Sequence, residues 1–376
     1  MPFQLTIPAR VNMLGNPGDA CEGDFAVLSA AIDLYAGAVV DPADDLVLEQ
    51  LERTDGGFET VRRLSFRPQD LPLPYDGTLD LVKGAINRLY GYSAAFRDRV
   101  REQGVRIGTW TDVPRQSGLG GSSLFVLLTL AGLRAAYDLD RPTHNDYVLA
   151  ELAQRVESKE LGITCGYADR YVPLFGGLAY VDYRGKLHQR ALGEEPLATY
   201  ERLDPWVDEL PVVIAFTGVE RDSGDVHGRL RADYLEAHEA WEERGGVIPR
   251  IVSFMSAAWE TAWRGKLALL AGDWEAFGRL MCENHRAVDE MMSYCGLSDG
   301  AGWANNRFIE AALANGALGA KLTGAGGGGS VFALTHPGEE EALAKIWRQV
   351  AEEEGLSGAR IFCPQISREG LVVEAT

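Results

Sequence analysis

The order of apolar and polar positions predicts a chain in which short strands alternate with helices. Apolar runs bounded by turn residues predict strands over residues 3–7, 27–40, 105–111, 212–216, 320–323 and 330–335. Apolar residues at helical spacing predict helices over about residues 79–90, 124–137, 145–161 and 306–314, with two or three more between residues 229 and 290. Such alternation is typical of α/β or α+β proteins.

The length of the chain favours two domains. At 376 residues it exceeds what a single hydrophobic core usually supports. The polar, proline-marked stretch 192–211 is the best candidate boundary, and we expect one domain over residues 1–195 and a second over residues 196–376. A ligand site is then expected in the cleft between them.

The charge of the chain restricts its partners. Acidic residues outnumber basic ones by 55 to 36, which gives a formal net charge of -19 spread along the sequence. Neither nucleic acid nor an anionic membrane is therefore expected as a partner. An anionic substrate such as a nucleotide would need local compensation by backbone N–H groups, a few Arg and Lys side chains or a divalent metal.

The cellular compartment is expected to be the cytoplasm. The five cysteines are scattered and lack the paired spacing of a zinc or redox site. No basic start followed by an apolar stretch opens the chain, and the longest apolar run, residues 124–133, is too short to span a bilayer.

A glycine- and serine-rich loop lies between a predicted strand and the predicted helix 124–137. Residues 112–123 read Asp-Val-Pro-Arg-Gln-Ser-Gly-Leu-Gly-Gly-Ser-Ser. Glycines allow close backbone approach to a ligand, and the free N–H groups at a helix N-terminus suit a phosphate. A flexible turn with a serine N-cap is the alternative. It is not a Walker loop, because no Gly-Lys-Ser/Thr follows.

A second glycine-rich loop lies near the C-terminus. Residues 321–330 read Lys-Leu-Thr-Gly-Ala-Gly-Gly-Gly-Gly-Ser and contain the dinucleotide pattern Gly324-x-Gly326-x-x-Gly329. An apolar β-like run follows where a nicotinamide-binding motif would open a helix, so NAD(H) binding is disfavoured. Close backbone approach to a ligand or a glycine-lined packing contact remains open.

Two carboxylates form the third candidate site. Glu157 ends a predicted helix, and Asp169 follows a glycine-containing loop. Phosphoryl transfer requires one carboxylate on Mg²⁺ and another that orients or deprotonates the attacking hydroxyl. Solvated surface carboxylates are the alternative. The apolar residues 171–175 and two following glycines predict that Asp169 stands at the entry to a half-buried strand.

In chain order, residues 114–123, 157–169 and 321–329 resemble the three signature regions of the GHMP kinases, the superfamily of galactokinase, homoserine kinase, mevalonate kinase and phosphomevalonate kinase. The opening Arg-Val-Asn-Met-Leu-Gly-Asn-Pro-Gly-Asp of residues 10–19 resembles the N-terminal motif of that family. The resemblance implies a two-domain α+β fold with mixed sheets, packed helices and an active site in the interdomain cleft. It also implies an enzyme that uses ATP and Mg²⁺ to phosphorylate a small-molecule hydroxyl.

The resemblance also implies roles for individual residues. Asp169 would be the catalytic base, and Arg10 would offset charge on the transferred phosphoryl group. Mg²⁺ would be held by Glu157 and Ser122, although an offset that puts Ser123 there stays open. The residues that would surround the ATP phosphates are Pro114, Gly118, Leu119, Gly120, Gly121, Ser122, Ser123, Gly324, Gly326 and Gly327. The residues that would contact the substrate are Asn16, Asp19, Asp24, Arg170 and Gly324.

Further details resemble the glucuronokinase and heptose-phosphate kinase branch, whose members phosphorylate an anomeric hydroxyl. They are the stretches 14–19, 169–177 and 222–227. Arg170 could pair with a uronate carboxylate or with a nearby acid of the protein. A glucuronokinase-like activity is expected first, then a heptose 7-phosphate kinase-like one, then galactokinase or mevalonate kinase. A nucleotide- and sugar-binding regulator without turnover is the alternative of another class. The protein is expected to be a monomer or a homodimer.

Overall fold

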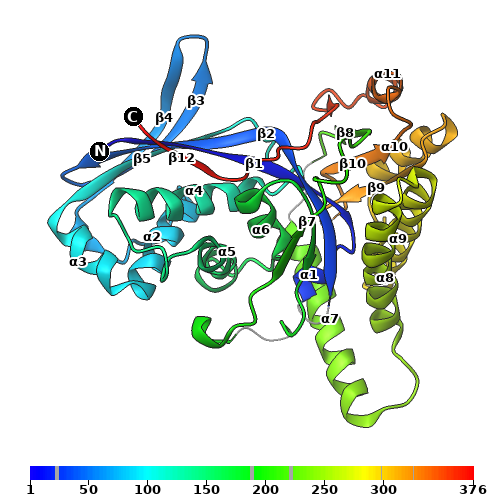
Figure 1. Cartoon of the computed structure of the whole chain (residues 1–376), viewed down its shortest axis with the longest axis horizontal. Helices are drawn as coiled ribbons and strands as arrows, with labels where there is room; N and C mark the ends of the chain where they lie inside the picture. The colour runs from blue at the N-terminus through cyan, green and yellow to red at the C-terminus, as the bar shows by residue number, and fades with distance from the viewer. Residues whose placement is uncertain (22–24, 187–189, 220–222, 298, 325) are drawn as a thin grey trace.

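The strands of the protein form two sheets that helices cover. The computed structural model describes residues 1–21, 25–186, 190–219, 223–297, 299–324 and 326–376. Figure 1 shows the larger sheet on the N-terminal side and the smaller sheet beside a group of long helices. This mixture of sheets and packed helices confirms the predicted α+β class.

The larger sheet has eight strands. They are β1 (Phe3–Leu14), β2 (Ala26–Ala43), β3 (Leu46–Thr54), β4 (Gly57–Phe66), β5 (Gly104–Thr111), β6 (Leu178–Asp182), β7 (Thr199–Arg202) and β12 (Val372–Ala375). The order is β12-β1-β2-β5-β3-β4, and β6 pairs with both β2 and β7. All pairs are antiparallel except β3 with β5. The long strand β2 joins the two ends of the sheet, since its first residues pair with β6 and its last with β5.

Helices of the first half pack beneath this sheet (Figure 1). They are α2 (Asp80–Tyr92), α3 (Ala94–Glu102), α4 (Gly121–Ala136), α5 (Asp146–Arg155) with the π-helical turn η2 (Val156–Glu160), and α6 (Ala168–Phe175). The short helix α1 (Gly18–Cys21) lies instead against β2 and helices of the second half. Helix α4 contacts β1, β2 and β5 as well as α2 and α5. It is apolar around most of its circumference because it is enclosed on several sides.

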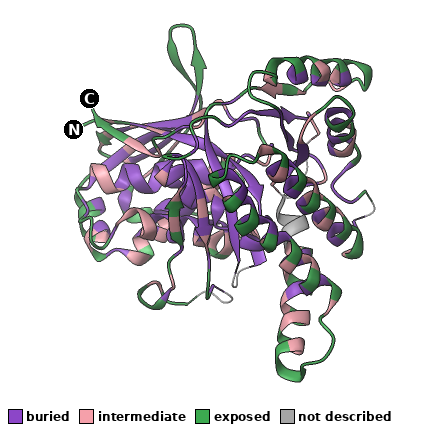
Figure 2. Ribbon diagram, turned by 45° about the vertical axis from the view of Figure 1, so that its right-hand side comes forward, coloured by how far each residue is buried: buried purple, intermediate pink, exposed green. Residues whose placement is uncertain are grey.

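The smaller sheet has the antiparallel order β11-β8-β10-β9. Its strands are β8 (Val212–Phe216), β9 (Gly319–Thr323), β10 (Ser330–Leu334) and β11 (Arg360–Phe362). The helices of this half are α7 (Ser223–Arg244), α8 (Arg250–Leu270), α9 (Trp274–Tyr294), α10 (Trp303–Ala314) and α11 (Glu340–Glu353). Strands β8, β9 and β10 are buried along their whole length, whereas Figure 2 shows that the end of α7 far from the sheets is exposed.

Buried hydrophobic residues form two clusters. The larger one lies beneath the larger sheet and extends to Ile214, Phe332 and Leu334 of the smaller sheet, while the other lies between the opposite face of the smaller sheet and the helices of the second half. The chain crosses from one to the other more than once, because β7 and β12 belong to the larger sheet although both follow residue 195. The division into residues 1–195 and 196–376 stays a prediction.

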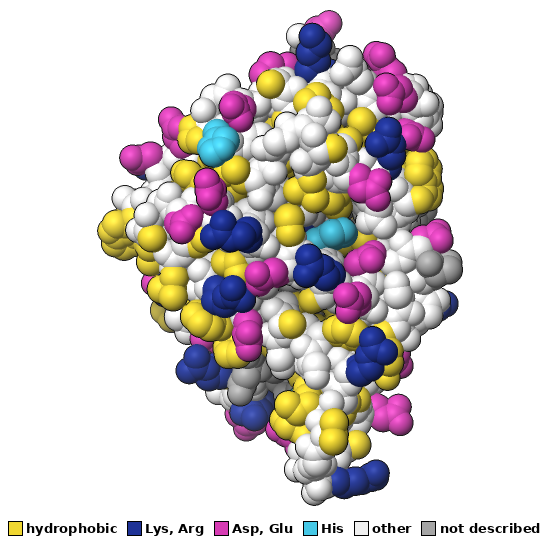
Figure 3. All heavy atoms as spheres, turned by 90° about the vertical axis from the view of Figure 1, so that its right-hand side faces the viewer, with side chains coloured by type: hydrophobic (Ala, Val, Ile, Leu, Met, Phe, Trp, Pro, Cys, Tyr) yellow, Lys and Arg dark blue, Asp and Glu magenta, His cyan; other side chains and the backbone are white. Residues whose placement is uncertain are grey.

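The surface carries both signs of charge. On the face in Figure 3, acidic and basic side chains are interspersed and do not gather by sign. Within the described ranges, we find no helix that combines the length and the apolar character needed to cross a membrane.

The expected strand after Asp169 is wrong, because residues 168–175 form helix α6. The apolar run and the two following glycines suggested a strand, but the start of the helix is fixed by a residue from elsewhere in the chain. The Asp19 carboxylate accepts hydrogen bonds from the backbone N–H groups of Tyr167 and Ala168, both at 2.9 Å. An anionic acceptor at this end stabilises a helix, and no local pattern reveals it.

Candidate active site

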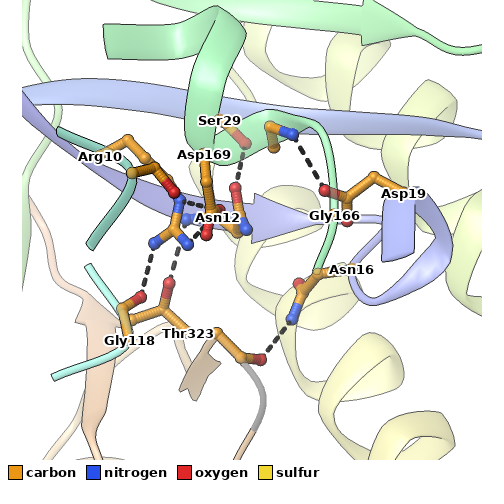
Figure 4. A network of polar contacts seen from close by, with 12 residues as sticks. Arg10, Asn12, Asn16, Asp19, Ser29, Gly118, Gly166, Asp169 and Thr323 are labelled. Atoms are coloured by element: carbon orange, nitrogen blue, oxygen red, sulfur yellow. Dashed lines mark hydrogen bonds and ion pairs between the residues drawn. The ribbon is translucent and has the colours of Figure 1, made fainter. Parts of the chain in front are cut away.

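Arg10 and Asp169 form the centre of the site. The guanidinium of Arg10, on β1, donates from Nε to Asp169 Oδ1 at 2.7 Å and also contacts this oxygen through Nη2. Its Nη1 donates to the carbonyl of Gly118 (Figure 4). The Arg10 side chain is 3% exposed and that of Asp169 is 22% exposed. The carboxylate of Asp169, at the start of α6, is therefore the more exposed member of the pair.

The first glycine loop leads into helix α4. Gly118 and Gly120 have φ values of 72° and 87°, a left-handed backbone that glycine adopts readily. Gly121 opens the helix. The N–H groups of the first helical turn are a ready site for phosphate oxygens. The N–H of Arg10 donates to Leu119 O at 3.2 Å, so β1 fixes this loop directly, while Pro114 is buried at its beginning.

Glu157 lies against the serines that follow the loop. Its Oε1 accepts from Ser123 Oγ at 2.8 Å, and its Oε2 lies 3.4 Å from Ser122 Oγ. Ser123 is fully buried and Ser122 is exposed. The π-helical turn η2 carries Glu157, and such turns occur often at functional sites.

The oxygens of this group fit a magnesium ion. Mg²⁺ prefers oxygen ligands and is usually held by one or two carboxylates together with substrate phosphates. Ser122, Ser123 and Glu157 offer hydroxyl and carboxylate oxygens beside the first glycine loop. Within the described part of the chain, no three His, Cys, Asp or Glu side chains gather in a way that could hold a metal. A metal here would thus depend on the nucleotide phosphates for further ligands.

The glycine-rich loop near the C-terminus, residues 324–329, corresponds to the third signature region and is called the third loop below. It meets the first glycine loop. It connects β9 to β10, so a strand follows it as expected and the dinucleotide interpretation is not supported. Gly324, Gly326 and Gly327 have φ values of 81°, 80° and 77°. A Cβ on Gly118 would lie 2.8 Å from Thr323 O, and a Cβ on Gly324 would lie 2.9 Å from Gly118 Cα. The two loops pack backbone to backbone, which brings both sets of predicted phosphate contacts together.

Asn16 links the N-terminal motif to the third loop. Its Oδ1 accepts from Lys321 Nζ at 2.8 Å, and its Nδ2 lies 3.5 Å from Gly324 O. Lys321 is fully buried and its second acceptor is Leu322 O at 2.7 Å. The amide of Asn16 is therefore held at the junction of the two glycine loops.

Asp19 has a structural task at the start of α6, where its carboxylate accepts two backbone N–H groups. Burial raises the pKa of this carboxyl above its ordinary value, and the neighbouring Asp169 adds to the rise. Its role as a substrate contact stays a prediction. Asp24, the weaker candidate from the same motif, lies outside the described residues.

The proposed contact of Arg170 with a substrate is not supported. Its side chain is 0% exposed, its Nη2 lies 2.6 Å from Glu157 Oε1, and its Nη1 lies 3.7 Å from Asp169 Oδ2. A guanidinium enclosed between two protein carboxylates cannot also form a fork with a uronate. The alternative interpretation, pairing with a nearby acid, is the one the structure has.

Sequence reasoning gave no role to Asn12, Ser29 or Thr323, which support the site. The backbone N–H of Asn12 donates to Thr323 Oγ1 at 3.0 Å, and its side-chain oxygen accepts from Ser29 Oγ at 2.7 Å (Figure 4). Asn12 follows Arg10 by two residues on one strand, so the two side chains share a face. The two-residue period of a strand could have indicated Asn12 from the position of Arg10, whereas the sequence does not indicate Ser29 or Thr323 as its partners.

Family models match both halves of the chain. The model of the GHMP kinases N terminal domain matches residues 80–177, and the model of the GHMP kinases C terminal region matches residues 304–353. The chain is 31% identical to the galactokinase of Thermococcus kodakarensis over 92% of each protein. The chain belongs to the GHMP kinase family.

Other proteins similar to this GHMP kinase are named as kinases of different sugars. It is 30% identical to the probable glucuronokinase 2 of Arabidopsis thaliana, over 91% of this chain and 87% of the relative. The fold matches that of Lactococcus lactis galactokinase complexed with galactose, with a TM-score of 0.75 and 21% identity over 99% and 95% of the two chains. The protein is thus an ATP-using sugar kinase of the GHMP family.

Proposed function

We propose that this kinase transfers the γ-phosphoryl group of ATP to the anomeric hydroxyl of a uronic acid or a closely related sugar. The observation that carries the chemistry is the convergence of Asp169, Arg10, Glu157 and two glycine loops on one region. The choice of a uronic acid rests on the glucuronokinase relatives at 30% and 27% identity. It no longer has support from Arg170, which is held by Glu157.

Each residue of the site has its own role in the proposed reaction. The sugar oxygen forms a bond to the γ-phosphorus while the bond to the bridging oxygen of ADP breaks, and the hydroxyl proton passes to Asp169. In a loose transition state the proton of the hydroxyl leaves late, so the carboxylate of Asp169 first orients the hydroxyl and then accepts its proton. Arg10 and the loop N–H groups offset charge on the phosphoryl oxygens.

Ser122 and Glu157 would hold Mg²⁺, whose charge would neutralise the phosphates when bound. Between the two serines, Ser122 is the better candidate. Ser123 is fully buried and its hydroxyl is used by Glu157 Oε1, whereas Ser122 is exposed beside Oε2.

Release of ADP in the presence of Mg-ATP tests the substrate. Glucuronate, galactose, a heptose 7-phosphate and mevalonate are offered separately, and glucuronate is expected to give the highest kcat/KM. A clear preference for galactose would replace the uronic acid with the substrate that the name of another relative carries. Binding of nucleotide and sugar without ADP release would favour a regulator without turnover.

The variant Asp169→Asn tests the base. Loss of a general base typically costs about 10²- to 10⁴-fold in turnover, so kcat should fall by that factor while nucleotide affinity is kept. The control is Asp204→Asn, since Asp204 also pairs with an arginine, Arg202, at 2.7 Å, but in the structure it takes no part in the site. Near wild-type kcat in Asp169→Asn would remove this carboxylate from the mechanism.

A further inference from the structure

Arg170 is a buried cation next to the catalytic machinery. It is the residue after Asp169 in α6, and its side chain is 0% exposed. Besides its contact with Glu157, its Nη1 donates to the carbonyl of Gly166. Protein groups therefore surround the guanidinium, and it has no route to a ligand.

In the described structure, Arg170 contacts one carboxylate oxygen of Glu157, Oε1, and does not contact the other, Oε2. Oε1 takes both the Arg170 Nη2, at 2.6 Å, and the Ser123 hydroxyl, at 2.8 Å. Oε2 has only the longer 3.4 Å approach of Ser122 among the hydrogen bonds in the described structure. Because Oε1 is engaged by the Arg170 ion pair and by the Ser123 hydrogen bond, the carboxylate is held in one orientation, and Oε2 is directed toward the exposed serine.

The same guanidinium balances the charge of the site. The carboxylates of Glu157 and Asp169 alternate with the guanidiniums of Arg10 and Arg170, since Arg10 pairs with Asp169 and Arg170 lies beside both acids. Opposite charges within about 4 Å attract strongly in a partly buried region. A lone divalent cation at Glu157 would therefore meet a carboxylate whose charge, like that of Asp169, is already compensated by a guanidinium.

We propose that Arg170 is a positioning residue that directs Glu157 Oε2 toward the metal and compensates its charge, so that the metal ion enters only together with the nucleotide phosphates. This rests on the proposed function, in which Glu157 is the metal ligand. It assigns to Arg170 a specificity for the metal–nucleotide complex over the free metal ion.

Binding of Mn²⁺ without nucleotide tests the proposal, because free aqueous Mn²⁺ can be counted by its electron paramagnetic resonance signal. Wild type should bind Mn²⁺ alone weakly, and Arg170→Gln should bind it at least tenfold more tightly. Arg170→Lys, which keeps the charge, should stay near wild type. The matched control is Arg155→Gln, which removes a largely buried arginine 3.1 Å from the buried Glu195 and should not change Mn²⁺ binding.

A second readout separates positioning from general support of the fold. In Arg170→Gln, the apparent KM for Mg-ATP should rise, because free Mg²⁺ can now occupy Glu157, and excess Mg²⁺ should inhibit. Equal Mn²⁺ affinities of Arg170→Gln and wild type would overturn the proposal. If Arg170→Gln does not fold, the wild-type protein still tests the proposal. Wild type that binds Mn²⁺ alone as tightly as Mn-ATP would also overturn it. The binding measurements do not need turnover, so a failure of this proposal can be distinguished from a failure of the proposed function in the ADP assay.

Discussion

Lys321, in the strand that precedes the third loop, and the neighbouring His285 are both largely buried. The hydrogen bonds of the Lys321 ammonium in the described structure go to Asn16 Oδ1 and Leu322 O, which are uncharged. Burial lowers the pKa of Lys321 well below its ordinary value. Burial, followed by the charge of Lys321, lowers the pKa of His285 to about 4. Asp289 and Asn306 also face His285 and oppose this decrease. The folded protein thus favours the neutral imidazole.

The depressed pKa of His285 predicts an acid-sensitive fold. The unfolded chain binds a proton near pH 6.5 and the folded chain only near pH 4, so stability falls as the pH decreases between these values. The loss amounts to about 3 kcal/mol once both forms are protonated. Urea unfolding from pH 7 to pH 4 should show a shallower decline for His285→Gln. The exposed His336→Gln serves as control, and an unchanged slope in His285→Gln would contradict the assignment.

At the scale of elements, the site depends on two glycine loops in backbone contact. Gly118 combines a φ of 72° with a Cβ position 2.8 Å from Thr323 O. Gly272, after α8, has a φ of 67° with nothing within 4 Å of its Cβ position. The two glycines share the conformational requirement, but only Gly118 has the steric one.

Comparing Gly118→Ala with Gly272→Ala isolates this contact. Both variants should lose about 1 kcal/mol for the left-handed backbone. Gly118→Ala should in addition move the first loop away from the third and weaken nucleotide binding tenfold or more, measured by calorimetry. Wild-type nucleotide affinity in Gly118→Ala would show that the loops need not touch to bind phosphate.

At the scale of the whole molecule, the loops that would hold the nucleotide come from both sheets. The N–H of Asn12 on β1 meets Thr323 Oγ1 on β9, and helix α8 packs on β1 and β2. A ligand that contacts both loops would therefore stabilise the two parts together.

A non-hydrolysable ATP analogue with Mg²⁺ should raise the unfolding temperature of the whole chain. At about 100 times its dissociation constant it adds about 2.7 kcal/mol of stability. Differential scanning calorimetry at one fixed concentration should show the full rise for Gly272→Ala and a reduced rise for Gly118→Ala. Equal rises would place the nucleotide away from the first loop.

The sequence by itself determined the family, the order of the motifs and most of the regular elements. Hydrophobic periodicity predicted β8 with its observed bounds and β5 and α4 to within a few residues, because alternation and helical spacing are local properties. The hairpin of β3 and β4 was missed, although Asp55-Gly56 between two runs rich in β-branched and apolar residues is a turn signal.

Only the tertiary structure decided what the charged residues of the site do. Residues 168–175 are a helix because Asp19, some 150 positions away, accepts its first N–H groups. Arg170 is buried and pairs with Glu157, and the two serines differ in burial although they are neighbours in sequence. Pairing of buried charges depends on which distant segments meet, and a local pattern of residue types carries no information about that meeting.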